Sequence, residues 1–313
     1  MGFRFPNPRR GLGREGVLLV ITPIQARGRN EVAATLRREG RAAFGFVERQ
    51  FTLMKRYWMW ELVWIIYSLT SSIAIGYGAK YMAIAATGNP HAVPDRMAVQ
   101  NLIIFMLIGS LLWGYLSGLF FDISNVVGWE RWEGTIEYTF MAPISRASHI
   151  LGMCLFSIIY GVLRTGAMLL AVAIVFHLDL SHANLWGAML VLAIGSFSFM
   201  GLGTLVAIFP LMSAEKGSQI TGIVEGMLLL FSGIYYKIEV LPVWMQFLSR
   251  LSPATYVLHG MRAALLEGAG FSTLWSDLWP LLISGCVLIP LGLKVFSWGE
   301  YYCKRTGSLK RSG

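Results

Sequence analysis

The chain has 313 residues, of which 55% are hydrophobic and only 14% are charged. Soluble globular domains are about 25% charged, so the composition excludes an ordinary soluble domain and indicates a membrane protein. The net charge is +9, and the three cysteines (Cys154, Cys286 and Cys303) form no Cys-x-x-Cys pair, which excludes a zinc site of that type and a disulfide framework.

The first 58 residues are predicted to form a cytoplasmic basic arm followed by an amphipathic helix. Residues 1–30 are rich in Gly, Arg and Pro and predict irregular structure. Residues 31–58 carry apolar side chains three or four positions apart, at Phe44, Val47, Phe51 and Met54. Such a stripe, with basic residues elsewhere, predicts a helix that lies at the membrane surface. A cytosolic helix packed on a partner is the alternative.

Six apolar runs are long enough to cross a bilayer: 60–80, 102–121, 150–176, 185–209, 219–236 and 279–302. About 20 helical residues cross the ~30 Å hydrocarbon layer, and only helices and closed barrels satisfy the backbone there. The sequence therefore predicts an all-α polytopic membrane protein with six transmembrane helices between residues 59 and 302. The first run begins too late for a cleaved signal peptide.

The basic residues indicate the orientation. They are concentrated before the first predicted span and in the tail at 303–313. Six spans place both ends on one side, and the positive-inside rule makes that side the cytoplasm. Beside a membrane span, the basic arm suits anionic lipid better than nucleic acid.

Between the second and third runs lies a polar cytoplasmic segment, whose residues 128–146 read "GWERWEGTIEYTFMAPISR". As one helix it places Val126, Trp129, Trp132, Ile136 and Phe140 on one face and Glu130, Glu133 and Glu137 on the neighbouring face. Helices on anionic membranes usually carry Lys and Arg, so this surface favours a cleft on another protein. The alternatives are a helix lying on the membrane, or a simple bend at Gly134 and Thr135.

These residues resemble the cytoplasmic loop of ABC-2 type permeases, the membrane subunits of one class of ATP-binding-cassette exporters. The matching positions are Glu133, Gly134, Thr135, Ile136, Glu137, Pro143, Ser145 and Arg146. Residues 231–268 resemble the family's external stretch between spans five and six, although Lys237 stands where many members have proline. The resemblance covers about residues 45–302.

The resemblance implies that the loop is a coupling helix docking on a cytosolic ATPase. Its contact residues would be Trp129, Glu130, Trp132, Glu133, Gly134, Thr135 and Glu137. The chain has no Gly-x-x-x-x-Gly-Lys-Ser/Thr motif, so we expect no catalytic residue and no bound cofactor here, with ATP and Mg²⁺ on two partner ATPase subunits. A second permease subunit, identical or closely related, would complete the transporter.

Two apolar stretches on the external side are too short to cross. We expect 238–250 and 254–267 to form two re-entrant helices that close the pathway, since such segments need protein around them at membrane depth; an external amphipathic loop is the alternative. The resemblance assigns the pathway walls to spans two and five, hence to Phe105, Trp113, Tyr115, Phe231, Tyr235 and Tyr236. Aromatic residues at span ends are also ordinary interface anchors.

Placing an ionisable residue inside a membrane span costs free energy, so such residues are functional candidates. Arg164 and Glu225 are two such residues, and we consider them a possible pair, either structural or functional. Gly114 with Gly118, and Gly222 with Gly226, allow close helix approach, within one subunit or between two. His177, Asp179 and His182 could bind a metal, but they are also common in turns, so no metal site is predicted.

The predicted function is export of a hydrophobic or amphipathic cargo, drug-like or lipid, from the cytoplasm or inner leaflet of a bacterial or archaeal inner membrane. One alternative is the same machine carrying a polysaccharide or lipid-linked glycan. A membrane-embedded transferase is a second, but the histidines are scattered and no catalytic cluster is visible. An ion-coupled carrier would be expected to show more charges within its spans.

Overall fold

The computed structural model describes residues 29–85, 96–177 and 183–306. The chain divides into two compact units, Met1–Arg41 and Ala42–Gly313. Every regular element of the described residues is helical, which confirms the all-α prediction.

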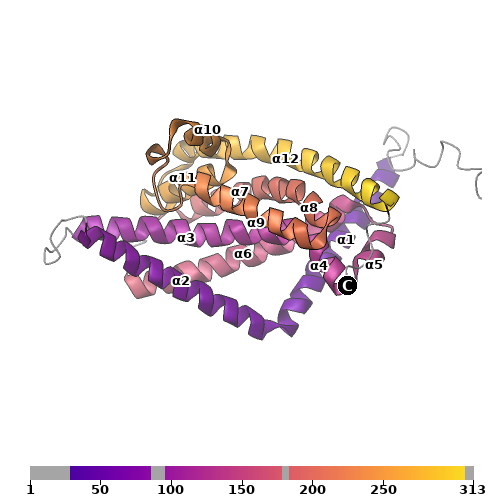
Figure 1. Cartoon of the computed structure of the whole chain (residues 1–313), viewed down its shortest axis with the longest axis horizontal. Coiled ribbons are helices and arrows are strands. Elements are labelled where there is room, and N and C mark those ends of the chain that lie inside the picture. Colours follow the sequence, from indigo (N-terminus) through magenta and orange to yellow (C-terminus); the bar gives the residue numbers. More distant parts are fainter. Residues whose placement is uncertain (1–28, 86–95, 178–182, 307–313) are drawn as a thin grey trace, which may run out of the picture. The chain divides into compact units, whose positions relative to one another are not determined.

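The helices follow one another in chain order (Figure 1). The first six are α1 (Arg29–Arg56), α2 (Trp58–Ala85), α3 (Arg96–Ser124), α4 (Val126–Glu133), α5 (Ile136–Met141) and α6 (Arg146–Phe176). The others are α7 (Leu185–Val206), α8 (Ile208–Met212), α9 (Ala214–Ser232), α10 (Val243–Leu251), α11 (Pro253–Leu266) and α12 (Phe271–Thr306). A 3₁₀ turn at Ile238–Val240 precedes α10. The predicted boundary after residue 58 falls beside the α1–α2 junction at Tyr57.

Five helical segments of the described chain are long and apolar enough to cross a membrane: α2, α3, α6, α7 continued by α8, and α12. The sixth predicted run, 219–236, corresponds to α9, a helix of 19 residues that carries Lys216 and Glu225. The chain is thus a multi-pass helical membrane protein, and a sixth span remains a prediction.

Helix α7 lies at the centre of the larger unit, where it packs against α12, α11 and α3. Close approach depends on glycine: a Cβ added at Gly201 would lie 2.6 Å from Leu288 Cβ and 2.7 Å from the Ile289 amide nitrogen. Where the helices meet, polar groups pair with one another, as Ser198 does with Ser284 at 2.5 Å. The core therefore combines backbone contact with satisfied hydroxyl groups.

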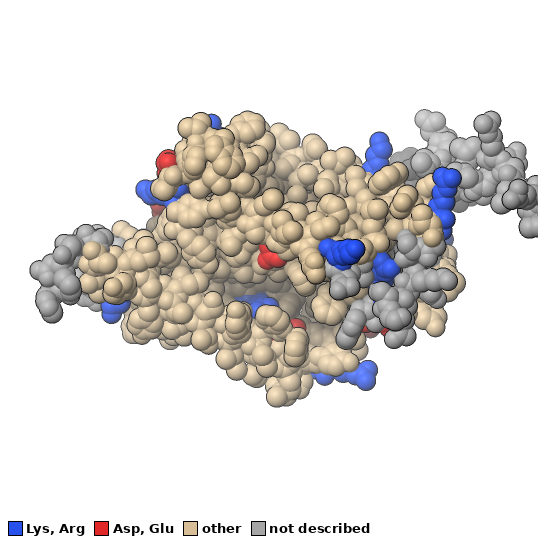
Figure 2. All heavy atoms as spheres, in the orientation of Figure 1, with Lys and Arg blue, Asp and Glu red and all other residues tan. Residues whose placement is uncertain are grey.

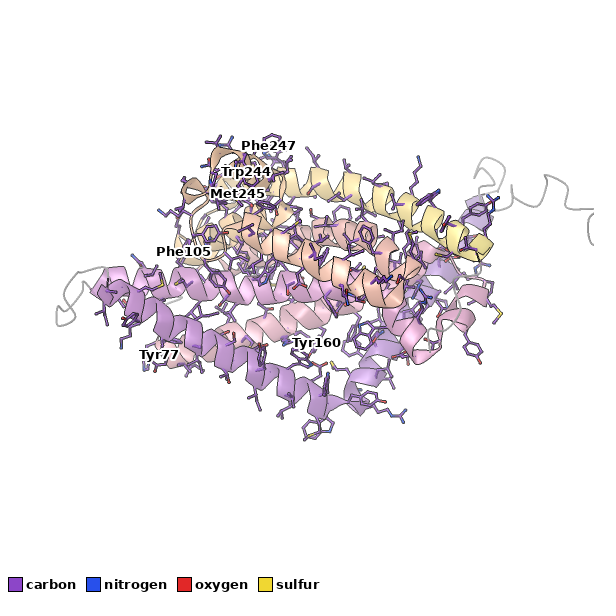
Figure 3. The ribbon with its side chains drawn as sticks, viewed as in Figure 1. Tyr77, Phe105, Tyr160, Trp244, Met245 and Phe247 are labelled. Atoms are coloured by element: carbon purple, nitrogen blue, oxygen red, sulfur yellow. The ribbon has the colours of Figure 1, made fainter. Side chains whose placement is uncertain are left out.

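Within Ala42–Gly313, α4 and α5 lie at one end of the long helices and α10 and α11 at the other (Figure 1). Both short helices predicted in the 237–267 region are present. Helix α11 is largely buried, through Ala254, Val257 and Leu258, whereas α10 exposes Trp244 and Phe247, which project from it in Figure 3. Their entry into the membrane remains a prediction.

Candidate functional site

The polar segment between α3 and α6 forms two helices, not the single helix predicted through Phe140. Helix α4 ends at Gly134, which has φ +74°, a left-handed conformation that favours glycine. The Gly134 amide donates to the Arg131 carbonyl, and the Thr135 amide donates to the Glu130 carbonyl at 2.9 Å. The prediction of one continuous helix is wrong because this cap turns the chain. Gly134 and Thr135 thus allow a bend, and the docking role of the segment stays a prediction.

The outer surface of this segment is aromatic and apolar. Trp129 is 50% exposed, Tyr138 74% and Met141 73%, and Glu133 is also exposed. Tyr138 and Met141 were not among the predicted contact residues, although they lie three positions apart just after the Gly-Thr-Ile-Glu motif. The side chains of Trp132 and Glu137 lie outside the described part of the structure. Among the described side chains, a partner protein would meet these three aromatic or apolar groups and the carboxylate of Glu133.

Glu130 has a different environment from its neighbours, because only 2% of it is exposed. One of its carboxylate oxygens, Oε1, lies 3.0 Å from His149 Nε2 and 3.5 Å from Arg49 Nη1. The same oxygen accepts a hydrogen bond from Thr139 Oγ1 at 3.3 Å. We call Arg49, Glu130, Thr139 and His149 the Glu130 joint, since they come from α1, α4, α5 and α6. Glu130 therefore acts inside the protein and is not part of the exposed surface.

The carboxyl-terminal half of α1 completes this joint. Arg49 Nη2 also pairs with Glu133 Oε2 at 2.9 Å, and the Phe46 ring lies 4.7 Å from that of His149. Val47 is buried, and Phe51 meets Phe156 of α6 edge to face at 5.1 Å. Part of the predicted apolar stripe of α1 thus packs on this chain's own α6, while Phe44 remains exposed.

Arg131 connects α4 to α8 through hydrogen bonds. Its Nη1 donates to the carbonyl groups of Leu211, at 3.1 Å, and Pro210, at 3.4 Å. These carbonyl groups lie in the last turn of α8, where a positive charge is favoured by the helix dipole. A displacement of α4 would consequently reach α1, α6 and α8 together.

The predicted pathway residues are mostly packed within the chain. Tyr115 is 4% exposed and shares a hydrogen bond with Ser196 of α7, and Trp113 is partly buried against the same core. Phe231 is half-buried, Tyr235 is exposed, and the Tyr236 hydroxyl donates to the Leu230 carbonyl. The role of these residues as pathway walls stays a prediction.

Phe105, the remaining predicted wall residue, lies under a guanidinium group. Arg262 of α11 stands 3.6 Å above its ring centroid, and donates to the carbonyl groups of Ile234, at 2.7 Å, and Gly233, at 3.2 Å. Burial lowers the pKa of the Arg262 guanidinium to about 10, which leaves it charged at neutral pH. Arg262 therefore joins α11 and α3 to the carboxyl-terminal end of α9.

Arg164 and Glu225 are not joined by an ion pair among the described residues. Arg164 Nη2 instead donates to Ser68 Oγ at 2.8 Å and to the Trp64 carbonyl at 3.4 Å, both in α2. Two carboxyl groups near Arg164, those of Glu61 and Asp122, were not predicted as site residues. Their signal in the sequence was an acidic residue within or beside an apolar run.

No group of three or more His, Cys, Asp or Glu residues capable of holding a metal is present in the described ranges. The histidine-rich loop considered in the sequence lies mainly outside them, at 178–182. Cys154 and Cys303 are buried, Cys286 is exposed, and all three are free thiols.

Comparison with known proteins gives consistent results. Residues 43–266 match the family described as ABC-2 type transporter. A protein described as the probable multidrug ABC transporter permease YbhR, from Escherichia coli strain K12, is 25% identical over 193 residues, which are 61% of this chain and 48% of that protein. Its counterpart in Escherichia coli O157:H7 matches to the same extent. The match spans about half the length of these relatives.

Proposed function

Because the chain belongs to the ABC-2 type transporter family, we propose that it is the membrane subunit of an ATP-driven exporter of hydrophobic or amphipathic molecules. The α4–α5 segment docks on a separate cytosolic ATPase, which binds the ATP and Mg²⁺. The observation that carries this proposal is the pairing of an exposed surface, at Trp129, Tyr138 and Met141, with the buried Glu130 joint behind it.

The coupling role follows from mechanical continuity. A docking element transmits motion only if it moves as one body with the spans, since a flexible loop would absorb the displacement. The joint supplies this continuity because Glu130 is bonded to groups from α1, α5 and α6. Buried charge-assisted hydrogen bonds are strong and directional, which suits them to hold α4 in one orientation.

We propose that two copies, or two related chains, assemble with two ATPase subunits. Gly114 and Gly118 of α3, and Gly222 and Gly226 of α9, have nothing within 4 Å of an added Cβ. These glycines are therefore not used for packing inside one subunit, and α9 exposes Ile223 and Met227 beside them. This open surface supports a second permease chain beside α9, and α9 as the sixth span.

The cargo class rests on the membrane setting and on the relatives named as multidrug permeases. We propose an inner-membrane location with both termini in the cytoplasm, supported by the basic residues that flank the spans.

The test is co-purification of an ATPase with the tagged chain from its native membrane. We expect the ATPase to accompany the native protein and to be lost from a variant with Trp129→Ala and Tyr138→Ala. The matched control carries Tyr81→Ala and Trp244→Ala, which remove two exposed aromatic side chains outside the α4–α5 segment. Absence of an ATPase from every preparation, or equal loss in both variants, would contradict the proposal.

A further inference from the structure

Side chains from three of the membrane-length helices place polar groups in a hollow beside α2. Glu61 and Ser68 come from α2, Asp122 from α3, and Ser157, Tyr160 and Arg164 from α6. Figure 2 shows the surface hollowed along α2, with a basic group inside. Figure 3 places Tyr160 in the same region, between α2 and α6. We call these six residues the α2–α6 hollow.

Hydrogen bonds hold these side chains in place but leave some of their acceptor positions unused. The Tyr160 hydroxyl donates to Glu61 Oε2, and Ser157 lies near Asp122. Arg164 Nη2 is engaged by Ser68 and the Trp64 carbonyl. A carboxylate has about four lone-pair positions, so these contacts leave acceptor capacity on Glu61 and Asp122. Asp122 is exposed although it lies in a membrane-length helix.

The charges in the hollow do not balance. Glu61 and Asp122 are two carboxyl groups against the single guanidinium of Arg164, and these three groups interact electrostatically. Arg164 forms no ion pair within 4.0 Å with either carboxyl group among the described residues. Ionisable side chains at membrane depth normally pair with one another or face a functional cavity. The formal excess of one acid leaves room for one further positive charge.

Aromatic side chains lie on the same helices. On α6, Phe156 and Tyr160 stack at 5.8 Å with nearly parallel rings. On α2, Trp60, Trp64 and Tyr67 form a row of edge-to-face contacts and are all exposed. A molecule that reaches Glu61 or Asp122 from the membrane thus passes aromatic surface, which suits an apolar body and also attracts cations through its ring faces.

We propose that the α2–α6 hollow binds the ammonium group of a cationic amphiphile, with Glu61 and Asp122 as its acceptors and the apolar part along α2. This inference rests on the proposed function, and it names the cargo class as amphiphiles that carry a positive charge. A cation is favoured over an anion because the carboxyl groups outnumber the guanidinium and Arg164 already donates to α2.

The test measures binding to the purified permease in detergent by fluorescence, which requires no ATPase. The probe is N-(5-aminopentyl)dansylamide, an amphiphilic primary amine, and the matched neutral probe is N-pentyldansylamide. We expect the double variant Glu61→Gln, Asp122→Asn to bind the amine about tenfold more weakly, the change that follows loss of a charge-assisted hydrogen bond. Binding of the neutral probe should change less than about twofold, because amide side chains keep the shape and polarity of the hollow.

Glu225→Gln is the matched control, because it removes a carboxyl group from α9 and leaves the hollow intact. It should bind both probes as the native protein does. The inference is overturned if the native protein does not prefer the amine, or if the double variant and Glu225→Gln weaken amine binding equally. Thermal unfolding of each variant shows whether it is folded, and a second pair, Glu61→Asp and Asp122→Glu, should restore preference for the amine.

The two proposals fail in different ways. If ATP drives no transport of either probe in proteoliposomes that contain the copurified ATPase, the exporter proposal is in doubt while amine binding can still be measured. If the neutral probe is transported and amine binding shows no dependence on Glu61 or Asp122, the hollow loses its assigned role and the exporter proposal stands.

Discussion

Helices α7 and α2 are both membrane-length and apolar, yet they use their surfaces in opposite ways. In the most apolar 18-residue stretch of α7 with α8, 67% of the residues are buried inside the protein, and in that of α2 only 17% are. Helix α7 meets its neighbours through glycines and paired hydroxyl groups, such as Ser198 with Ser284. Helix α2 is attached to α6 through longer polar side chains, Glu61 to Tyr160 and Arg164 to Ser68.

The difference shows how apolar helices are distinguished inside a bilayer. Lipid is as apolar as leucine, so burial of apolar side chains alone does not decide which helix lies at the centre. Close backbone contact at Gly201 holds α7 against α12. Helix α2 instead combines apolar packing, where Gly76 lies against the Phe176 ring of α6, with directed hydrogen bonds to α6.

The largest expected effect comes from filling a glycine contact. Gly201→Leu in α7 should prevent folding or lower stability by about 3 kcal/mol or more, because its Cβ would lie against the α12 backbone. Gly78→Leu in α2, where nothing lies within 4 Å, should leave the apparent Tm within a few degrees. Thermal unfolding of purified protein measures both. Equal tolerance at the two positions would remove the distinction between α7 and α2.

The Glu130 joint provides the next largest effect, since Glu130, Thr139 and His149 are buried but polar. His149→Ala removes a hydrogen-bond partner of the buried Glu130 and the ring that packs against Phe46. We therefore expect the free energy of unfolding to fall by about 1–3 kcal/mol. The matched change His259→Ala removes an exposed ring and its hydrogen bond to Asp277, and should cost less because water can reach that bond. Apparent Tm values for the two variants provide the comparison, and a His149→Ala protein as stable as the native one would show that the joint is not rigid.

A matched pair of tyrosine substitutions compares the hydrogen bonds of α7 with those of α2. Tyr115→Phe removes the hydroxyl bonded to Ser196 in the core beside α7, and Tyr160→Phe removes the one bonded to Glu61 of α2. We expect Tyr115→Phe to lower the free energy of unfolding by about 1–2 kcal/mol and Tyr160→Phe by less than about 1 kcal/mol. The second loss is smaller because Glu61, left in an open hollow, can accept a hydrogen bond from another donor. Chemical denaturation in mixed micelles measures the difference, and the reverse order would contradict this explanation.

The smallest effect is a pH dependence at the α11–α12 contact. The hydrogen bond that His259 Nδ1 donates to Asp277 Oδ2, at 2.8 Å, raises the pKa of His259 above its usual 6.5. A raised pKa in the folded state means that this stabilisation is present below pH 6.5 and is lost as the pH rises through the folded value. We expect apparent Tm to fall over that interval, and only slightly because His259 is largely exposed. The fall should be absent from Asp277→Asn, which lacks the carboxylate. A fall of the same size in Asp277→Asn would assign it to other groups.

The amino-acid sequence by itself predicted the all-helical membrane fold, two short helices after residue 237 and the polar segment between α3 and α6. Of its six predicted spans, five are membrane-length helices among the described residues. These follow from local rules: the length of apolar runs, proline and glycine positions, and the period of the helix. The family could also be predicted, because residues 133–137 match its motif within the polar segment between α3 and α6, and the family match covers residues 43–266.

Only the tertiary structure decided which side chains face one another. Glu130 and Glu133 lie three positions apart, but the first is buried against His149 and the second pairs with Arg49 at the surface. Arg164 is directed to α2, and not to Glu225, because α6 packs beside α2 and α3. Glu130 and His149 are 19 residues apart, Arg49 and Glu133 are 84 apart, and Ser68 and Arg164 are 96 apart. No periodicity within one segment carries that information, since it depends on how the helices approach and rotate.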